Sequence, residues 1–203
     1  QYLTAYYPFV EIAKIKKGDF VLIGAASSSA GLGAIDIIKS CGGFVIAATR
    51  SEKKIDFLKQ YGADEVIDTS KNNFSKKILN ITNNTGLRAV YDPIGNPFYK
   101  QYLDVLQTGS IIFHFGLLSG ESIKVDLSKH VRKDSYLLPY SMFNYVNNES
   151  SVTRGVNYIT TKINEGIFRP KIDKVFSFEE TIAAYNYMME YDVIGKIVVQ
   201  LNK

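Results

Sequence analysis

A run of small residues, Gly24–Gly31 (GAASSSAG), is the segment of this chain whose composition best fits a chemical role. Where such a turn leads from a strand into a helix, its backbone N–H groups and the helix N-terminus can bind a pyrophosphate. The three positions of the usual glycine fingerprint correspond here to Ala26, Ser28 and Gly31. Gly31 is therefore the one fingerprint glycine that this turn keeps. The segment predicts a dinucleotide-phosphate site; the alternative is a small-residue turn without a ligand.

The residues that follow indicate which dinucleotide would bind. A site for NAD places Asp or Glu about 20 residues past the turn, where it accepts from the ribose 2′-hydroxyl. Residues 37–51 contain no acid, and the expected place reads Thr49-Arg50-Ser51. Arg50 can form paired hydrogen bonds to a 2′-phosphate, Ser51 can donate another, and Lys54 follows one helical turn later. We therefore expect NADP(H); the alternative is a solvated basic helix start, which would oppose the helix dipole.

Strands and helices alternate around this turn. Short apolar runs predict strands at 19–24, 44–48, 65–67, 89–91 and 111–115. Apolar residues at helical spacing predict helices from 32 to the glycines at 42 and 43, and at 51–61, 74–81 and 98–106, with Ser51 as a cap. This alternation indicates an α/β fold built from βαβ units with a parallel sheet.

The pattern changes from about residue 148. Apolar residues between 152 and 163 predict a longer amphipathic helix, and Ser177–Glu180 (SFEE) is a capping box that opens a second helix. Residues 195–201 predict a final strand. Because two helices and two strand-like runs are too few for an independent domain, we expect this segment to complete another one.

The composition, 46% hydrophobic and 22% charged over 203 residues, is that of an ordinary globular protein. The net charge is +4, but the lysines are scattered among acids along the whole chain, which argues against a nucleic-acid-binding surface. The single cysteine, Cys41, excludes an internal disulfide and suits a reducing compartment, so we expect the cytoplasm. All apolar stretches are shorter than the ~20 residues of a membrane-spanning helix.

Several motifs in order along the chain carry a family resemblance. They are Gln1–Tyr6 (QYLTAY), Ala25–Leu32 (AASSSAGL), Tyr61–Asp68 (YGADEVID), Asp92–Gly95 (DPIG) and the ending Gly195–Val199 (GKIVV). With these motifs the chain resembles the medium-chain dehydrogenase/reductase superfamily, in particular its zinc-independent quinone oxidoreductase (zeta-crystallin-like) branch. The resemblance implies a Rossmann-type doubly wound parallel sheet and the C-terminal segment of a split GroES-like catalytic domain.

The resemblance also implies roles for individual residues. The implied NADP(H) contacts are Ser28, Ser29, Ala30 and Gly31 at the phosphates, Arg50, Ser51, Lys54 and Thr69 at the 2′-phosphate, and Phe115, Gly116 and Leu117 near the nicotinamide, with Ser141 and Phe143 close by. This chain departs from the family by serines in the glycine turn and by Thr69, where some members carry a tyrosine. Both departures bear on the affinity for the cofactor.

The implied activity is NADPH-dependent hydride transfer to a quinone or an α,β-unsaturated carbonyl, without zinc, in a cytoplasmic homodimer. The implied units are an NADP(H)-binding domain at 1–147 and the C-terminal part of the catalytic domain at 148–203. We expect the N-terminal part of that domain, with most substrate contacts, to precede Gln1. Ser135–Tyr140 would be the edge strand that pairs two subunits, although it equally fits a core-facing last strand.

Other functions stay open at this point. A zinc-dependent alcohol dehydrogenase of the same superfamily would need clustered ligands, and Cys41, His114 and His130 show no such spacing. Tyr158–Lys162 (YITTK) fits the Tyr-x-x-x-Lys pattern of short-chain reductases, but Tyr145 stands where that family has its serine. The remaining alternatives are a nucleotide-binding module without turnover and an RNA-binding or crystallin-like role.

Overall fold

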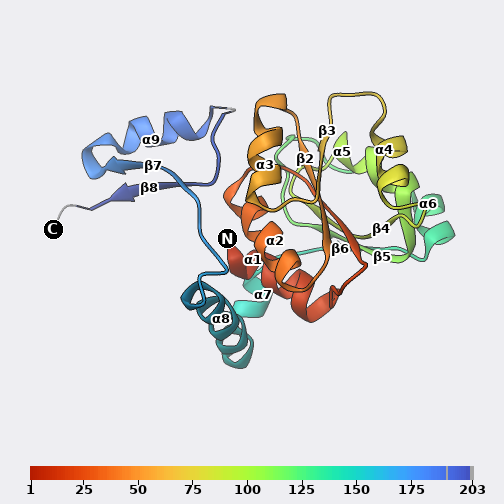
Figure 1. Cartoon of the computed structure of the whole chain (residues 1–203), viewed down its shortest axis with the longest axis horizontal. Coiled ribbons are helices and arrows are strands. Elements are labelled where there is room, and N and C mark those ends of the chain that lie inside the picture. The colour runs from red at the N-terminus through yellow and green to blue at the C-terminus, as the bar shows by residue number, and fades with distance from the viewer. Residues whose placement is uncertain (191, 202–203) are drawn as a thin grey trace.

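A parallel β-sheet organises the structure, a computed structural model that describes residues 1–190 and 192–201. The sheet has six strands in the order β3-β2-β1-β4-β5-β6 (Figure 1). These strands are β1 (Phe20–Ile23), β2 (Phe44–Thr49), β3 (Glu65–Asp68), β4 (Leu87–Asp92), β5 (Leu106–His114) and β6 (Tyr136–Pro139). The order runs outward from β1 in one direction and from β4 in the other, so the predicted doubly wound Rossmann-type sheet is confirmed.

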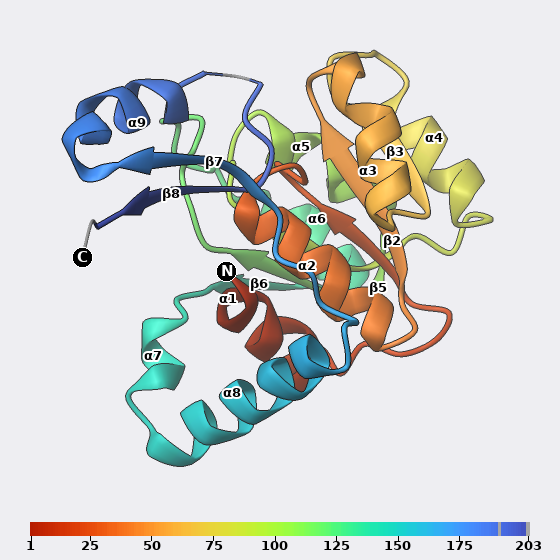
Figure 2. The same cartoon turned by 60° about the vertical axis from the view of Figure 1, so that its left-hand side comes forward.

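Helices bury both faces of the sheet, as Figures 1 and 2 show. Alternate strand residues therefore enter two apolar cores, with Ile23 and Tyr91 in one and Leu22 and Val90 in the other. The helices that contribute to the first core are α1 (Tyr2–Tyr6), α2 (Ser29–Ser40) and α3 (Ile55–Tyr61). The helices on the opposite face are α4 (Phe74–Ile81), α5 (Phe98–Tyr102) and α6 (Leu127–Lys133).

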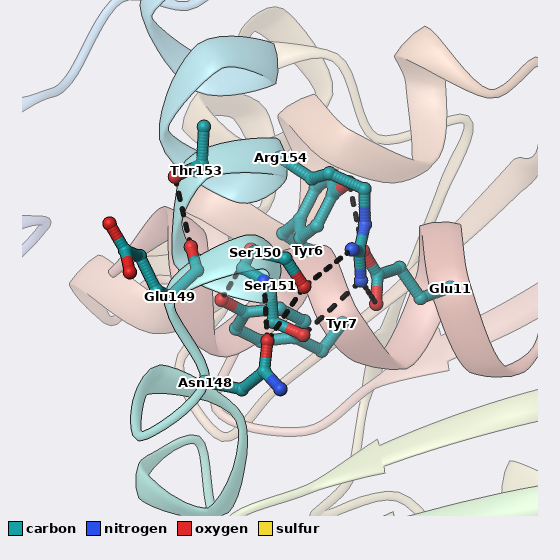
Figure 3. Close-up of polar contacts among 9 residues, drawn as sticks. All are labelled: Tyr6, Tyr7, Glu11, Asn148, Glu149, Ser150, Ser151, Thr153 and Arg154. Carbon is teal, nitrogen blue, oxygen red and sulfur yellow. Dashed lines mark hydrogen bonds and ion pairs between the residues drawn. The ribbon is translucent and has the colours of Figure 1, made fainter.

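The long helix α8 (Glu149–Asn164) packs outside the first core. Its neighbours are α1, the π-helical segment η1 (Tyr7–Ile12) and α7 (Phe143–Val146). Figure 3 shows the contacts at its start, where the Arg154 guanidinium lies 2.9 Å from the Glu11 carboxylate and the Tyr7 hydroxyl donates to the Ser151 carbonyl at 3.2 Å. Asn148 caps the helix by accepting from the Ser151 N–H. These contacts fix α8 against the N-terminal helices.

The rest of the C-terminal segment forms a second, smaller sheet at one side of the molecule (Figure 1). It consists of the parallel pair β7 (Ile172–Ser177) and β8 (Lys196–Gln200), joined through η4 (Phe178–Glu180) and α9 (Thr181–Met188). The predicted capping box is confirmed, because the side chains of Ser177 and Glu180 bond reciprocally to each other's backbone amides. Of the described residues from 172 to 201, the buried apolar ones are Phe176 and Ala184.

The structure corrects a predicted helix boundary and a predicted helix cap. The helix expected at 98–106 ends at Tyr102 and continues as the 3₁₀ turn η3 (Leu103–Val105), because Leu106 already pairs with Leu87 and begins β5. Ser51 precedes the 3₁₀ turn η2 (Glu52–Lys54), but in the described chain its side chain makes no capping hydrogen bond. Within residues 1–190 and 192–201, no helix combines the length and apolar character needed to cross a membrane.

Candidate nucleotide-binding site

A cavity of about 570 Å³ opens beyond the carboxyl ends of the strands. Its walls come from the turns at the ends of five strands: Ala25 and Ser27 after β1, Thr49–Ser51 at β2, Thr69 and Ser70 after β3, Ile94 after β4, and Leu118 and Ser119 after β5. In open α/β sheets this edge, next to the point where the strand order reverses, is where ligands bind. The position of the cavity therefore follows from the sheet topology.

The turn between β1 and α2 leads directly into a capped helix. Ser28 has an extended backbone, and its Oγ accepts from the Gly31 N–H at 3.1 Å. A Cβ added at Gly31 would lie 2.5 Å from the backbone oxygen of Ala26, so no larger residue fits there without a shift of the backbone. The close approach of the helix to the turn before it thus requires a glycine at the last fingerprint position. The first helical amides, those of Ser29 and Ala30, lack acceptors within the helix itself.

The structure brings four predicted 2′-phosphate contacts to the same cavity. Arg50, Ser51, Lys54 and Thr69 all line it, beside the carboxyl ends of β2 and β3. Lys54 is buried, and its ammonium donates to the Ser27 hydroxyl at 3.3 Å and to a backbone carbonyl at 3.0 Å. Burial lowers the pKa of Lys54. A buried ammonium and a neighbouring guanidinium make this end of the cavity suitable for a phosphate.

A short C-terminal segment, which we call the strap (Asp192–Gly195), runs along the turn. The Gly195 N–H donates to the Ser27 carbonyl at 3.0 Å, and Gly195 forms a parallel bridge with Ser28. The carbonyl of Val193 is the second acceptor of the Lys54 ammonium. The first residue of the strap, Asp192, lies at the basic part of the cavity and is one of its lining residues.

An apolar wall lies next to the basic end. Ile94 and Phe98, from the loop after β4 and from α5, line the cavity. The buried carboxylate of Asp92 holds this loop by accepting from the backbone amides of Ile94 and Gly95 at 2.8 and 3.0 Å. The Tyr102 hydroxyl donates to the same carboxylate at 2.7 Å. The wall is therefore fixed by buried hydrogen bonds at the end of β4.

The predicted nicotinamide contacts lie beside the cavity rather than in its wall. Phe115, Gly116 and Leu117 follow β5 directly. Among the described residues, those of this loop that line the cavity are the next two, Leu118 and Ser119. Ser141 and Phe143 follow β6, and the Phe143 side chain is exposed. All five lie at the carboxyl edge of the sheet, and their contact with a cofactor stays a prediction.

The cysteine and the histidines have separate structural surroundings. His114 Nδ1 lies 3.7 Å from the buried Asp92 carboxylate, which raises the pKa of the imidazole against an opposing effect of burial. His130 Nε2 lies 2.7 Å from the Tyr99 hydroxyl, and Cys41 ends α2, where burial raises the pKa of its thiol. In the part of the chain that the structure describes, no three His, Cys, Asp or Glu residues gather as a metal site.

The Tyr-x-x-x-Lys pattern lies on α8, away from the cavity. The Tyr158 hydroxyl is 2.7 Å from Ser40 Oγ at the end of α2, and Lys162 pairs with Glu165 at 2.9 Å. Both side chains thus have structural partners at the outer helix layer. The geometry gives the short-chain reductase alternative no support.

Sequence reasoning missed part of the cavity wall. Asp192 reaches it from the far end of the chain, since the strap and Lys54 are joined across 139 positions, and no local spacing indicates such a contact. Ile94, by contrast, follows a predicted strand directly. The rule that ligands bind at the carboxyl ends of strands could have identified it.

Comparison with known proteins decides the family. Residues 30–157, well over half of the chain, match the family model described as zinc-binding dehydrogenase. The chain belongs to the zinc-binding dehydrogenase family. The small-residue turn at Gly24–Gly31, the basic residues Arg50 and Lys54, and the loop after β4 all lie at or close to the matched region.

Named relatives within the zinc-binding dehydrogenase family confirm the predicted resemblance. The chain is 28% identical over 199 residues to a 2-haloacrylate reductase from Burkholderia sp, covering 97% of this chain and 60% of the relative. It is 25% identical over 198 residues to a quinone oxidoreductase from Pseudomonas aeruginosa, covering 97% and 61%. The chain therefore spans about 60% of the length of these curated relatives.

Two solved structures superpose closely on this chain. A crystal structure of 2-haloacrylate reductase superposes with a TM-score of 0.87 at 27% identity, covering 96% of this chain and 61% of that one. The Escherichia coli quinone oxidoreductase complexed with NADPH gives a TM-score of 0.89 at 24% identity, covering 98% and 62%. The second likeness shows the shared fold, and with the first it confirms the predicted fold class.

Proposed function

We propose that the cavity beyond β1 to β5 binds NADP(H), and that the whole protein uses this cofactor to reduce a quinone or an α,β-unsaturated carbonyl compound without zinc. The observation that carries the proposal is the gathering of Arg50, Lys54 and the small-residue turn around one cavity. A phosphorylated ribose needs cationic donors, and residues 49–51 offer a guanidinium with no acid. The residues present therefore fit NADP(H).

The phosphate groups of the cofactor have matching groups in the chain. The amides of Ser29 and Ala30, at the N-terminus of α2, suit the pyrophosphate, and the partial positive charge of that terminus favours an anion. Arg50 would hold the 2′-phosphate, with Ser51 and Thr69 as hydroxyl donors. Because its pKa is lowered by burial, the Lys54 ammonium gains from an added negative charge nearby.

The relatives support the reaction class. One is named a 2-haloacrylate reductase and another a quinone oxidoreductase, and both names describe electron-poor unsaturated substrates. Bound NADPH supplies a hydride for such a substrate. This chain's residues bind and orient the cofactor, and the apolar side chains of Ile94 and Phe98 exclude water from its wall. Phe115, Gly116, Leu117 and Ser141 remain our proposed neighbours of the nicotinamide.

The division into 1–147 and 148–203 is part of the proposal. Exposed apolar side chains support it, because the unit of β7, β8 and α9 leaves Val175, Phe178 and Ile182 between 50% and 78% exposed. Monomeric proteins rarely leave such surface uncovered. We assign residues 148–203 to a catalytic domain whose other part covers this face in the whole protein, although α8 itself packs against α1.

A homodimer in the cytoplasm completes the proposal. β6 is at the edge of the main sheet, and Tyr136 on it is 64% exposed, so its backbone and side chains are placed to pair with a second copy. Leu137 and Leu138 are partly buried against the two cores, which fits the alternative role of a core-facing last strand. The free Cys41 suits a reducing compartment.

The test is a reductase assay on the full-length protein with NADPH, a small quinone and an enone, before and after treatment with EDTA. We expect NADPH oxidation with at least one of the two acceptors, unchanged by EDTA. Loss of activity on chelation would favour the zinc-dependent alternative. Saturable NADPH binding without turnover of either acceptor would favour a binding module and contradict the proposed reaction.

A further inference from the structure

The basic end of the cavity includes a carboxylate that β2 does not supply. Arg50 and Lys54 line this end together with Asp192, which belongs to the strap at the other end of the chain. An acid at this place is what NAD-binding sites use to accept from the ribose 2′-hydroxyl. Cationic and anionic side chains thus meet where the two coenzymes differ.

Three consecutive anchors hold the strap in place. The Val193 carbonyl accepts from the Lys54 ammonium at 3.0 Å, Ile194 packs against the first core, and the Gly195 N–H donates to the Ser27 carbonyl at 3.0 Å. The residue just before these anchors is Asp192. Its backbone position therefore follows from the contacts of the next three residues with Lys54, the first core and Ser27.

The charge of Asp192 acts on the cationic groups of this site. It raises the pKa of Lys54, whereas burial, the largest effect, and Arg50 lower it. Asp192 Oδ2 also lies 3.6 Å from Lys53 Nζ, but both side chains are exposed, by 66% and 81%, and such pairs are weak. The carboxylate therefore contributes negative potential where a 2′-phosphate would bind.

We propose that Asp192 is a specificity-determining residue, which limits the preference of this cavity for NADPH over NADH. The inference rests on the proposed function and deepens it. The carboxylate repels a 2′-phosphate and is an acceptor for an unphosphorylated 2′-hydroxyl, and both effects favour NADH relative to NADPH. The strap thus offsets part of the selectivity that Arg50 provides.

The experiment compares Asp192→Asn with the unmodified protein by titrating each with NADPH and with NADH, following coenzyme fluorescence. The readout is the ratio of the two dissociation constants. In a water-like dielectric, one charge at the cavity wall acting on a doubly charged phosphate changes binding by roughly threefold to tenfold. We expect the preference for NADPH to rise by that factor at low salt, and by less at about 1 M salt, where screening is strong.

Two matched variants separate charge from structure. Asp192→Glu keeps the charge and should retain the ratio of the unmodified protein. Glu190→Gln removes a charge from an exposed position shortly before the strap that does not line the cavity, and should also leave the ratio unchanged. Thermal unfolding of all variants verifies that each is folded.

The outcomes distinguish the two proposals. A raised ratio for Asp192→Asn alone supports the inference. If the unmodified protein binds both coenzymes and the ratio does not move, or moves equally in Glu190→Gln, the role of Asp192 is overturned while the proposed function stands. If the unmodified protein binds neither coenzyme, the proposed function and this inference are both rejected.

Discussion

Replacing Gly31 with alanine tests the close approach of α2 to the small-residue turn that precedes it. The added Cβ would lie 2.5 Å from the Ala26 backbone oxygen, a contact that only a backbone shift can relieve. Gly33, two positions later on the same helix, offers a matched control, since its Cβ would meet its nearest neighbours at 3.4 Å. Alanine is favoured over glycine in a helix by about 1 kcal/mol, and this gain is common to both variants. The overpacking cost of roughly 1–3 kcal/mol applies to Gly31→Ala alone.

We therefore expect Gly31→Ala to be less stable than Gly33→Ala by about 1–3 kcal/mol. For a chain of this size each kcal/mol corresponds to roughly 2–4 °C in Tm. The assay is thermal unfolding by circular dichroism with urea midpoints alongside, followed by NADPH titration of both variants. Because the displaced helix carries the amides of Ser29 and Ala30, Gly31→Ala should also bind NADPH more weakly than Gly33→Ala. Equal stabilities and equal affinities for the two variants would show that α2 accommodates a methyl group at Gly31 without displacement.

Three further predictions concern single side chains. Ser28→Ala removes the acceptor of the Gly31 N–H and should cost about 1 kcal/mol, seen as a lower Tm. Tyr158→Phe should leave NADPH binding and reductase activity intact; lost activity would revive the short-chain mechanism. Burial raises the pKa of Asp36 to about 6, above its ordinary 3.8. The folded state thus favours the protonated form, and the contribution of Asp36 to stability, fully present below pH 3.8, is lost as the pH rises through 6. Between pH 4 and 7 the Tm of the unmodified protein should fall relative to that of Asp36→Asn; parallel profiles would contradict this.

The main sheet could be predicted because its signals are local. Each buried strand is a short apolar run, and the glycines at 42 and 62 end α2 and α3 with φ of +81° and +129°, which favour glycine. The boundary between α5 and β5 could not be predicted in the same way. Leu106 continues the helical spacing of apolar residues that starts at Phe98 and Tyr102, and its pairing with Leu87 across the sheet decides that it is a strand residue.

The candidate site likewise contains residues that local signals predict and a residue that long-range contacts place. Arg50 and Lys54 were predictable, because they follow a strand whose end faces the ligand edge of the sheet. Asp192 was not, because its place in the cavity depends on the contacts of the strap with Ser27 and Lys54, which join distant parts of the chain. Long-range contacts of this kind leave no periodic trace in the sequence.

The most direct measurement is a pair of coenzyme titrations on the unmodified protein and on Arg50→Ala. We expect saturable binding with a lower dissociation constant for NADPH than for NADH. A charge-assisted hydrogen bond contributes about 1.5–3 kcal/mol, so Arg50→Ala should weaken NADPH binding by roughly 10- to 100-fold and change NADH binding little. Equal dissociation constants for the two coenzymes, or no saturable binding of either, would contradict this expectation.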